Sequence, residues 1–249
     1  MKTIQLLLVA GTLLVHSGYA IDRDSSNVLL KKAKVARVEK RISLATNLFN
    51  QSIEQDPTNT EAYKELSSFA MDMKNYRQAY LALTQWYELE PQNEAVIKPL
   101  ANIYFMMGKH KDALTIVKKW ESAHESEPMH YIAGMSNYYL ENFAEAINRL
   151  MYAAEKETEN PTIQYTIGRS YIELGRYEKA IPFYQKAVDL DKKNARYAYE
   201  LAMVYYSVPD DKKSIAMFEL AAQRGWVQNA DYFENLAYSY MNAGNFIKA

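Results

Sequence analysis

The stretch PTIQYTIGRSYIELGRYEKAIPFYQKAVDLDKKN, residues 161–194, decides the fold, because segments like it recur along almost the whole chain. Related segments begin at Ser26, Thr60, Glu94, Glu127, Ala195 and Ala230. A period of roughly 34 residues is typical of architectures in which each unit stacks on its neighbours. Positions below are counted from the first residue of each repeat, and the last repeat is incomplete.

Small and large residues alternate at fixed positions of the repeat. Position 8 holds Ala, Ser or Gly in every repeat, position 20 holds Ala or Ser, and position 24 is large and apolar in every complete repeat. Small residues opposite large ones let two antiparallel helices approach closely. Position 15 lies between the two apolar stripes and is a helix breaker at Gly108, Gly175, Pro209 and Gly244. Each repeat is therefore predicted to be a helical hairpin.

This pattern resembles the tetratricopeptide repeat family. Residues 161–194 match the family at positions 8, 11, 15, 17, 20, 24 and 27, as Gly168, Tyr171, Gly175, Tyr177, Ala180, Tyr184 and Ala187. The resemblance covers nearly all of residues 21–249. It implies an all-α, right-handed α-solenoid of stacked helical hairpins, with six full repeats and a partial seventh. FELAAQRG, residues 218–225, is closer to the related Sel1-type repeat, so a mixed array is an alternative.

Two other repeat classes fit the residues less well. Pentatricopeptide arrays read RNA in a basic groove, whereas this chain has a formal net charge of −1. Coiled coils need heptads sustained across what are here predicted turns. No nucleic-acid partner is expected.

The N-terminus, MKTIQLLLVAGTLLVHSGYA, has the features of a secretory signal peptide. Lys2 supplies the positive charge, the segment 4–15 is apolar, and Gly18 and Ala20 suit a signal peptidase. The apolar run is shorter than the roughly 20 residues that span a bilayer. We expect cleavage after residue 20 and an exported chain, periplasmic in a Gram-negative cell or secreted, with no transmembrane segment. The absence of cysteine suits an oxidising compartment.

One segment of the sequence is a candidate metal site. HESEPMH, residues 124–130, gathers His124, His130 and two glutamates. The histidines stand six apart and flank Pro128, unlike the i, i+4 pair of a helical zinc site, so a solvated loop is favoured. The sequence has no G-x-S-x-G elbow and no phosphate-binding Gly loop. No enzyme activity, cofactor or metal is expected, and a hydrolase built on the array is the least favoured alternative.

The segment from Lys31 to Arg41 is rich in cations, with Glu39 as its only acid. It suits contact with anionic lipid or glycan. The favoured alternative is the polar outer face that a terminal repeat needs for solubility.

The family resemblance implies that the first helices of the hairpins line an inner concave surface through positions 2, 5, 9, 12 and 13. In the middle repeats these positions hold aromatic, methionine and basic residues, a composition that suits a peptide ligand. The predicted groove residues are Lys98, Asn102, Tyr131, Met135, Tyr138, Tyr165, Arg169, Arg196, Tyr199 and Met203. Aromatic residues at these positions also pack between hairpins, so recognition and packing both stay open for each tyrosine. Lys98 and Asn102 begin a carboxylate clamp known in the family, but Ile132, Thr162 and Thr166 leave it incomplete.

Together these features predict a non-catalytic protein–protein interaction scaffold of the cell envelope that binds partner polypeptides in its concave groove. The alternative is the N-terminal recruiting arm of a longer multidomain envelope protein, whose C-terminal part anchors to peptidoglycan or is enzymatic. NAGNFIKA, residues 242–249, favours a longer protein, because Ala249 takes position 20, inside the second helix of its hairpin. The sequence leaves homo-oligomerisation open.

Overall fold

The computed structural model describes residues 21–247, and these residues form helices and no strand. The helices are α1 (Arg23–Val38), α2 (Ile42–Gln55), α3 (Thr60–Asp72), α4 (Tyr76–Leu89), α5 (Glu94–Met106), α6 (His110–Ala123), α7 (His130–Tyr139), α8 (Phe143–Lys156), α9 (Pro161–Glu173), α10 (Tyr177–Leu190), α11 (Ala195–Ser207), α12 (Asp211–Gln223) and α13 (Ala230–Asn242). The predicted signal peptide and Ala249 lie outside the described residues. Across residues 21–247, no helix has both the length and the apolar character needed to cross a membrane.

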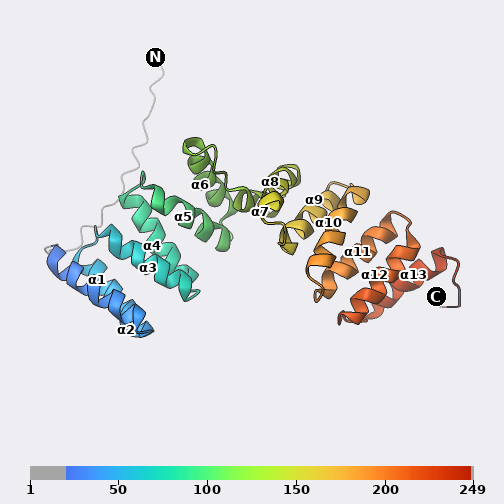
Figure 1. Cartoon of the computed structure of the whole chain (residues 1–249), viewed down its shortest axis with the longest axis horizontal. Helices are drawn as coiled ribbons and strands as arrows, with labels where there is room; N and C mark the ends of the chain where they lie inside the picture. The colour runs from blue at the N-terminus through green and yellow to red at the C-terminus, as the bar shows by residue number, and fades with distance from the viewer. Residues whose placement is uncertain (1–20, 248–249) are drawn as a thin grey trace, which may run out of the picture. The chain divides into compact units, whose positions relative to one another are not determined.

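Successive helices pack as hairpins, which Figure 1 shows as neighbouring pairs. The pairs are α1 with α2, α3 with α4, α5 with α6, α7 with α8, α9 with α10, and α11 with α12. Within each stack, the second helix of one hairpin also packs on the first helix of the next, as α8 does on α9. The predicted all-α solenoid of helical hairpins is therefore confirmed.

The hairpins are grouped into two compact units. The first ends at Pro91 and contains α1 to α4, and the second begins at Gln92 and contains α5 to α13. Each unit has its own hydrophobic core. In the second unit, one core cluster formed by α10, α11 and α12 includes the fully buried Tyr184 and Leu201.

The small residue at position 8 makes room for the large one at position 24. A Cβ added to Gly168 would lie 2.7 Å from a ring carbon of Tyr184, and one added to Gly134 would lie 2.6 Å from Leu150. Both distances are too short for real carbon atoms, so the two helices of these hairpins approach as closely as their side chains allow.

Position 15 takes the left-handed backbone conformation in every hairpin turn between residues 21 and 247. The residues are Lys40, Lys74, Gly108, Glu141, Gly175, Pro209 and Gly244, with φ between 24° and 74°. Each turn is closed by a backbone bond of the helix-ending Schellman type, such as Arg176 N to Tyr171 O at 2.8 Å and Asn75 N to Ala70 O at 2.8 Å. Only glycine adopts this conformation without strain, so Lys40, Lys74 and Glu141 hold it at a cost in stability.

The loop before α7 departs from the regular repeat. α7 begins at His130, three residues after the repeat start at Glu127, because the segment around Pro128 is held in another conformation. Met129 N donates to Glu121 Oε1 at 3.1 Å, and Trp120 Nε1 donates to the Glu127 carbonyl at 2.9 Å. These bonds anchor the loop to α6.

Candidate functional site

Glu200, on α11, is the centre of a polar cluster in the second unit. Its Oε1 accepts from Tyr165 OH at 2.9 Å and from Arg196 Nε at 2.7 Å. Its Oε2 accepts from Tyr184 OH at 3.0 Å and lies 3.5 Å from Arg169 Nη1. Four donors from α9, α10 and α11 therefore converge on one carboxylate, which we call the Glu200 cluster.

The Glu200 cluster is electrically balanced. Arg169 also pairs with Glu173 at 3.1 Å, so two arginines face two glutamates. Burial, and then the negative charge of Glu200, raise the pKa of Tyr165 and of Tyr184 above the usual value, so both phenols keep their protons. The predicted groove arginines are thus neutralised within the chain, and the expectation of a weakly basic groove does not hold in this part of the surface.

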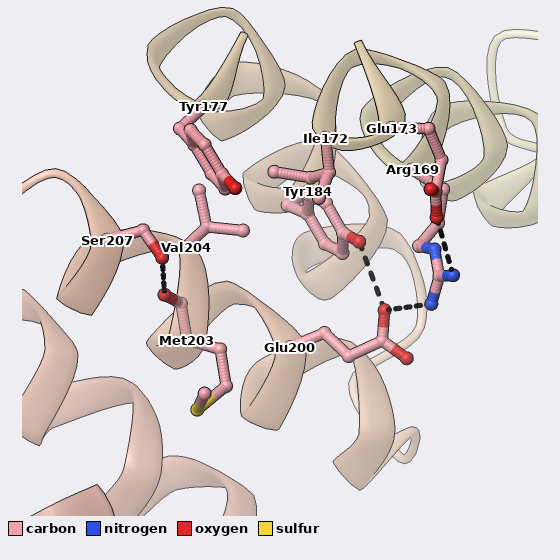
Figure 2. A pocket seen from close by; sticks show the side chains of 9 residues that line it. All are labelled: Arg169, Ile172, Glu173, Tyr177, Tyr184, Glu200, Met203, Val204 and Ser207. Carbon is pink, nitrogen blue, oxygen red and sulfur yellow. Dashed lines mark hydrogen bonds and ion pairs between the residues drawn. The ribbon is translucent and has the colours of Figure 1, made fainter. Parts of the chain in front are cut away.

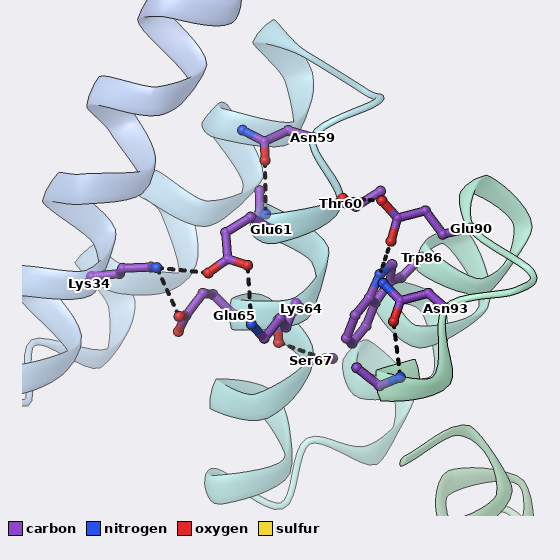
Figure 3. A network of polar contacts seen from close by, with 12 residues as sticks. Lys34, Asn59, Thr60, Glu61, Lys64, Glu65, Ser67, Trp86, Glu90 and Asn93 are labelled. Carbon is purple, nitrogen blue, oxygen red and sulfur yellow. Dashed lines mark hydrogen bonds and ion pairs between the residues drawn. The ribbon is translucent and has the colours of Figure 1, made fainter. Parts of the chain in front are cut away.

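The same geometry joins repeats in both units. Arg169 occupies position 9 of its repeat, and Glu200 occupies position 6 of the next. In the first unit, Lys34 at position 9 pairs with Glu65 at position 6 of the next repeat, at 2.9 Å (Figure 3). Tyr199 at position 5 accepts from Asn235 at position 6, as Tyr165 donates to Glu200. Position 6 therefore receives polar contacts from positions 5 and 9 of the preceding repeat.

A hollow of about 320 Å³ lies beside the Glu200 cluster (Figure 2). Ile172, Met203 and Val204 give it apolar walls, and Ser207 and Tyr177 lie on the side away from Glu200. Arg169 also lines the hollow, and its buried Nε has no hydrogen-bond acceptor within residues 21–247. This combination suits an apolar side chain next to a polar backbone group.

A second hollow, of about 300 Å³, lies between α5, α7 and α8. Asn102 and Tyr131 line it, together with Ile132, Lys156 and Glu157. Two predicted groove residues are thus brought together here. Burial raises the pKa of Tyr131, so its phenol is neutral and serves as a hydrogen-bonding group.

Lys98 has partners within the chain. Its Nζ lies 2.8 Å from Glu127 Oε2 and 4.4 Å from the ring centre of Trp120. Lys98 is at position 5, like Tyr165, but position 6 of the next repeat, where Tyr165 finds Glu200, is Ile132 here. Lys98 therefore turns to the loop before α7, and the incomplete carboxylate clamp loses its cation to Glu127.

The structure separates the other predicted residues into buried and accessible ones. Met135 is only 4% exposed and packs against Ile147, Leu150 and Ile163, so it belongs to the core. An unbranched, flexible thioether can fold into a gap where the Arg169 side chain, at the same repeat position, cannot. Tyr138 and Tyr199 are half-buried: Tyr138 packs edge-on against Phe143, and Tyr199 stacks on Trp226 at 4.3 Å. A role of these residues in a groove stays a prediction.

Both histidines of the candidate metal segment stack on aromatic side chains. His124 stacks on Trp120 at 3.7 Å and approaches Glu94 at 3.3 Å, and His130 stacks on Tyr152 at 4.9 Å. Burial, followed by the charge of Arg149, lowers the pKa of His130. Residues 21–247 contain no group of three or more His, Cys, Asp or Glu side chains that could hold a metal ion.

Sequence reasoning missed Glu200, the residue that organises the site. The predicted groove is lined by positions 2, 5, 9, 12 and 13, whereas Glu200 is at position 6. One signal was available: Arg196 and Glu200 are four residues apart on one helix, a spacing at which opposite charges pair. Tyr184 was recognised only as the large residue of position 24, not as a hydrogen-bond donor.

Comparison with protein families supports the repeat architecture. The family model for anaphase-promoting complex, cyclosome, subunit 3, matches residues 72–153, and a TPR repeat model matches residues 168–208. No curated protein sequence matches the chain.

Several solved structures have a similar fold. MamA from AMB-1 is 18% identical, with 70% of this chain and 96% of MamA covered and a TM-score of 0.60. YrrB, described as a TPR protein with an unusual peptide-binding site, is 18% identical over 71% of this chain and 92% of YrrB, with a TM-score of 0.58. PilW, described as a widely conserved type IV pilus biogenesis factor, is 15% identical over 86% of this chain and 97% of PilW, with a TM-score of 0.59.

These identities are low, so the similarity to solved structures bears on the fold. Tetratricopeptide arrays are typically non-catalytic interaction scaffolds, although one scaffold serves many partners. The repeated hairpins, the repeat-family matches and the shared fold lead to one conclusion: this chain is a member of the tetratricopeptide repeat family.

Proposed function

We propose that this protein is a non-catalytic scaffold of the cell envelope that binds polypeptide segments on the first-helix side of its second unit. The observation that supports this proposal is the pair of hollows at Asn102 and Tyr131 and at Arg169 and Met203. Each combines apolar walls with a few polar groups, the composition of a side-chain binding site. YrrB, with a similar fold, is described as having a peptide-binding site, which supports the ligand class.

The hollow beside the Glu200 cluster favours an uncharged apolar residue of the ligand. Its two arginines and two glutamates cancel, so a charged side chain would gain little from entering. Ile172, Met203 and Val204 offer the apolar contact. Specificity for a short apolar motif follows from this arrangement.

Location in the envelope is supported by the signal-like sequence of residues 1–20 and by the fold shared with PilW, a pilus biogenesis factor. We propose cleavage after Ala20 and a periplasmic location. N-terminal sequencing of the protein purified from its native cells should begin at Ile21. Recovery of a chain that begins at Met1 from the cytoplasm would contradict this part of the proposal.

The binding test uses variants that spare the Glu200 cluster, because replacing Arg169 or Tyr165 would also disturb packing. Met203→Asp places a charge in the first hollow, and Asn102→Trp fills the second. Lys212→Ala, at an exposed position of α12, is the matched control.

Each variant serves as bait in native envelope extract, and captured proteins are identified by mass spectrometry. A partner that is captured by the parent and the control but lost with Met203→Asp or Asn102→Trp supports the proposal, provided that helical circular dichroism is unchanged. Capture of the same proteins in the same amounts by all variants would refute binding at these hollows.

A further inference from the structure

The outward face of the first hairpin differs from the corresponding face of later repeats. Positions 3, 7 and 10 of a first helix face the second helix of the preceding repeat. Position 7 is Leu66 in the first unit and Ile167 and Leu201 in the second, and all three are buried. In the first repeat, positions 3, 7 and 10 are Val28, Lys32 and Val35, and all three are exposed. The face that stacks elsewhere is open here.

This open face has an apolar floor. Val28 and Val35 are 49% and 56% exposed. Between α1 and α2 the face contains a hollow of about 460 Å³ whose apolar walls come from Val35, Leu44 and Leu48. We call the surface formed by Val28, Lys31, Lys32, Val35, Leu44 and Leu48 the end face. A terminal repeat with a purely polar outer surface would not need such a floor.

The rim of the end face is positive. Lys31, Lys32 and Arg41 line the hollow with a single acid, Glu39, which pairs with Arg41 at 3.2 Å. Lys31 and Lys32 have no ion pair among the described residues. By contrast, Lys34 and Arg37, also on α1, are paired with acids of α3 at 2.9 Å and 3.1 Å. The charges turned toward α3 are balanced, and those on the end face are not.

We propose that the end face binds an acidic amphipathic α-helix of a partner protein, which takes the place of the second helix of a preceding repeat. Later repeats show the arrangement: on α9, Ile163 and Ile167 at positions 3 and 7 pack in one core with Ile147 and Ala153 of α8. At the end face, valines take the apolar contacts, and Lys32 at position 7 requires an acidic residue opposite it. The end face belongs to the first unit and is separate from the hollows proposed above for polypeptide binding.

Charge argues against two other occupants of the end face. Residues 1–20 contain no Asp or Glu, so they do not complement Lys31 and Lys32. A second copy bound through the same face would place lysines against lysines, which is unfavourable.

The test uses a fluorescent peptide with the α8 sequence, residues 143–156, in which Arg149→Glu and Lys156→Glu make it acidic. Its binding to the chain comprising residues 21–249 is followed by fluorescence anisotropy. The peptide with the natural Arg and Lys is the matched probe. We expect the acidic peptide to bind about tenfold more tightly than the natural one. Its binding should weaken as the salt concentration is raised.

Variants locate the binding. The double variant Lys31→Glu with Lys32→Glu should weaken binding of the acidic peptide by about tenfold or more. Val35→Asp should also weaken this binding. Lys212→Glu and Met203→Asp should leave it unchanged, which separates this proposal from the one above. Lack of binding by the acidic peptide, or equal binding to the Lys31 and Lys32 variant, would overturn the proposal.

Two measurements test whether residues 1–20 or a second copy of the chain, rather than a partner helix, covers the end face. If the chain of residues 1–249 does not bind the peptide whereas residues 21–249 do, the N-terminal segment covers the face, and a partner helix is the wrong occupant. If light scattering shows a dimer that Lys31→Glu with Lys32→Glu dissociates, a second copy is the occupant. A monomer that binds the acidic peptide with or without residues 1–20 supports the proposal.

Discussion

Two polar networks join successive first helices, one in each unit. Each is centred on a glutamate at position 6, but the two glutamates differ in their partners and in the exposure of those partners. In the first unit, Glu65 accepts from Lys34 and Arg37, and Lys34 is 40% exposed. In the second unit, Glu200 accepts from Arg196 and from two tyrosines, of which Tyr184 is fully buried, and it forms an ion pair with Arg169 at 3.5 Å. Both use the contact from position 9 to position 6 of the next repeat. Exposure, rather than the number of charges, decides how much each network contributes to stability.

The comparison predicts unequal losses when each central carboxylate is removed. Glu200→Ala leaves the buried Tyr184 hydroxyl without its acceptor and Arg169 with Glu173 as its remaining acid, and should destabilise the fold by about 2 to 3 kcal/mol. Glu65→Ala leaves partners that water can reach and should cost about 1 kcal/mol or less. Urea unfolding followed by circular dichroism measures both. Equal losses would show that exposure does not distinguish the networks.

A substitution outside the Glu200 cluster should disturb it through packing. Gly168→Ala brings a methyl group against the Tyr184 ring, which sits 2.7 Å from the new Cβ position. The ring must shift, which disturbs the Tyr184 bond to Glu200, and a destabilisation of about 1 to 3 kcal/mol is expected. Gly168→Ala combined with Tyr184→Leu should be destabilised by less than the sum of the two single changes. Strict additivity in urea unfolding would contradict the packing explanation.

Substitutions at position 15 of the hairpin turns test whether the backbone strain of these turns is present in both units. Lys74→Gly in the first unit and Glu141→Gly in the second replace residues held at φ of 56° and 62°. Each should raise stability by about 0.5 to 1 kcal/mol, because glycine adopts this conformation without strain. Gly108→Ala is the matched control and should lower stability. A gain in only one unit, measured by thermal unfolding, would show that the turns are not equivalent.

Alkaline pH should act on the Glu200 cluster through its tyrosines. The pKa values of Tyr165 and Tyr184 are raised in the folded state, so the unfolded chain releases these protons first as the pH rises. Stability from this source is present below the ordinary tyrosine pKa of about 10 and is lost above it. Thermal unfolding should therefore shift to lower temperature above about pH 10, and less so in Tyr184→Phe. The same pH dependence in Tyr184→Phe would assign the effect to other groups.

Much of the fold could be predicted from the sequence because it rests on a repeated local pattern. Gly168 opposite Tyr184 shows why: a small residue facing a large one is visible in the sequence and has one structural solution. A turn is predicted in every repeat, but a helix-breaking residue marks it only where position 15 is Gly or Pro. Lys40, Lys74 and Glu141 adopt the same conformation because backbone hydrogen bonds of the turn impose it, and no side-chain signal reports them.

The candidate site was less predictable, because its chemistry depends on contacts between repeats. Arg169 and Arg196 are predicted groove residues, but the sequence gives no direct sign that Glu200 pairs with both. Met135 and Met203 share position 9, yet one is buried and the other lines a hollow. A repeat position sets the direction of a side chain, whereas its neighbours decide whether it reaches solvent.

The left-handed turns also bear on the order in which the chain folds. A hairpin with glycine at position 15 closes without conformational strain. In a hairpin with lysine there, the lysine must adopt the strained left-handed conformation before the two helices can pair. Both complete hairpins with glycine turns, at Gly108 and Gly175, lie in the second unit, and both hairpins of the first unit turn at lysines, Lys40 and Lys74. Refolding is therefore expected to nucleate in the second unit, so the first part of the chain to be synthesised would be the last to fold.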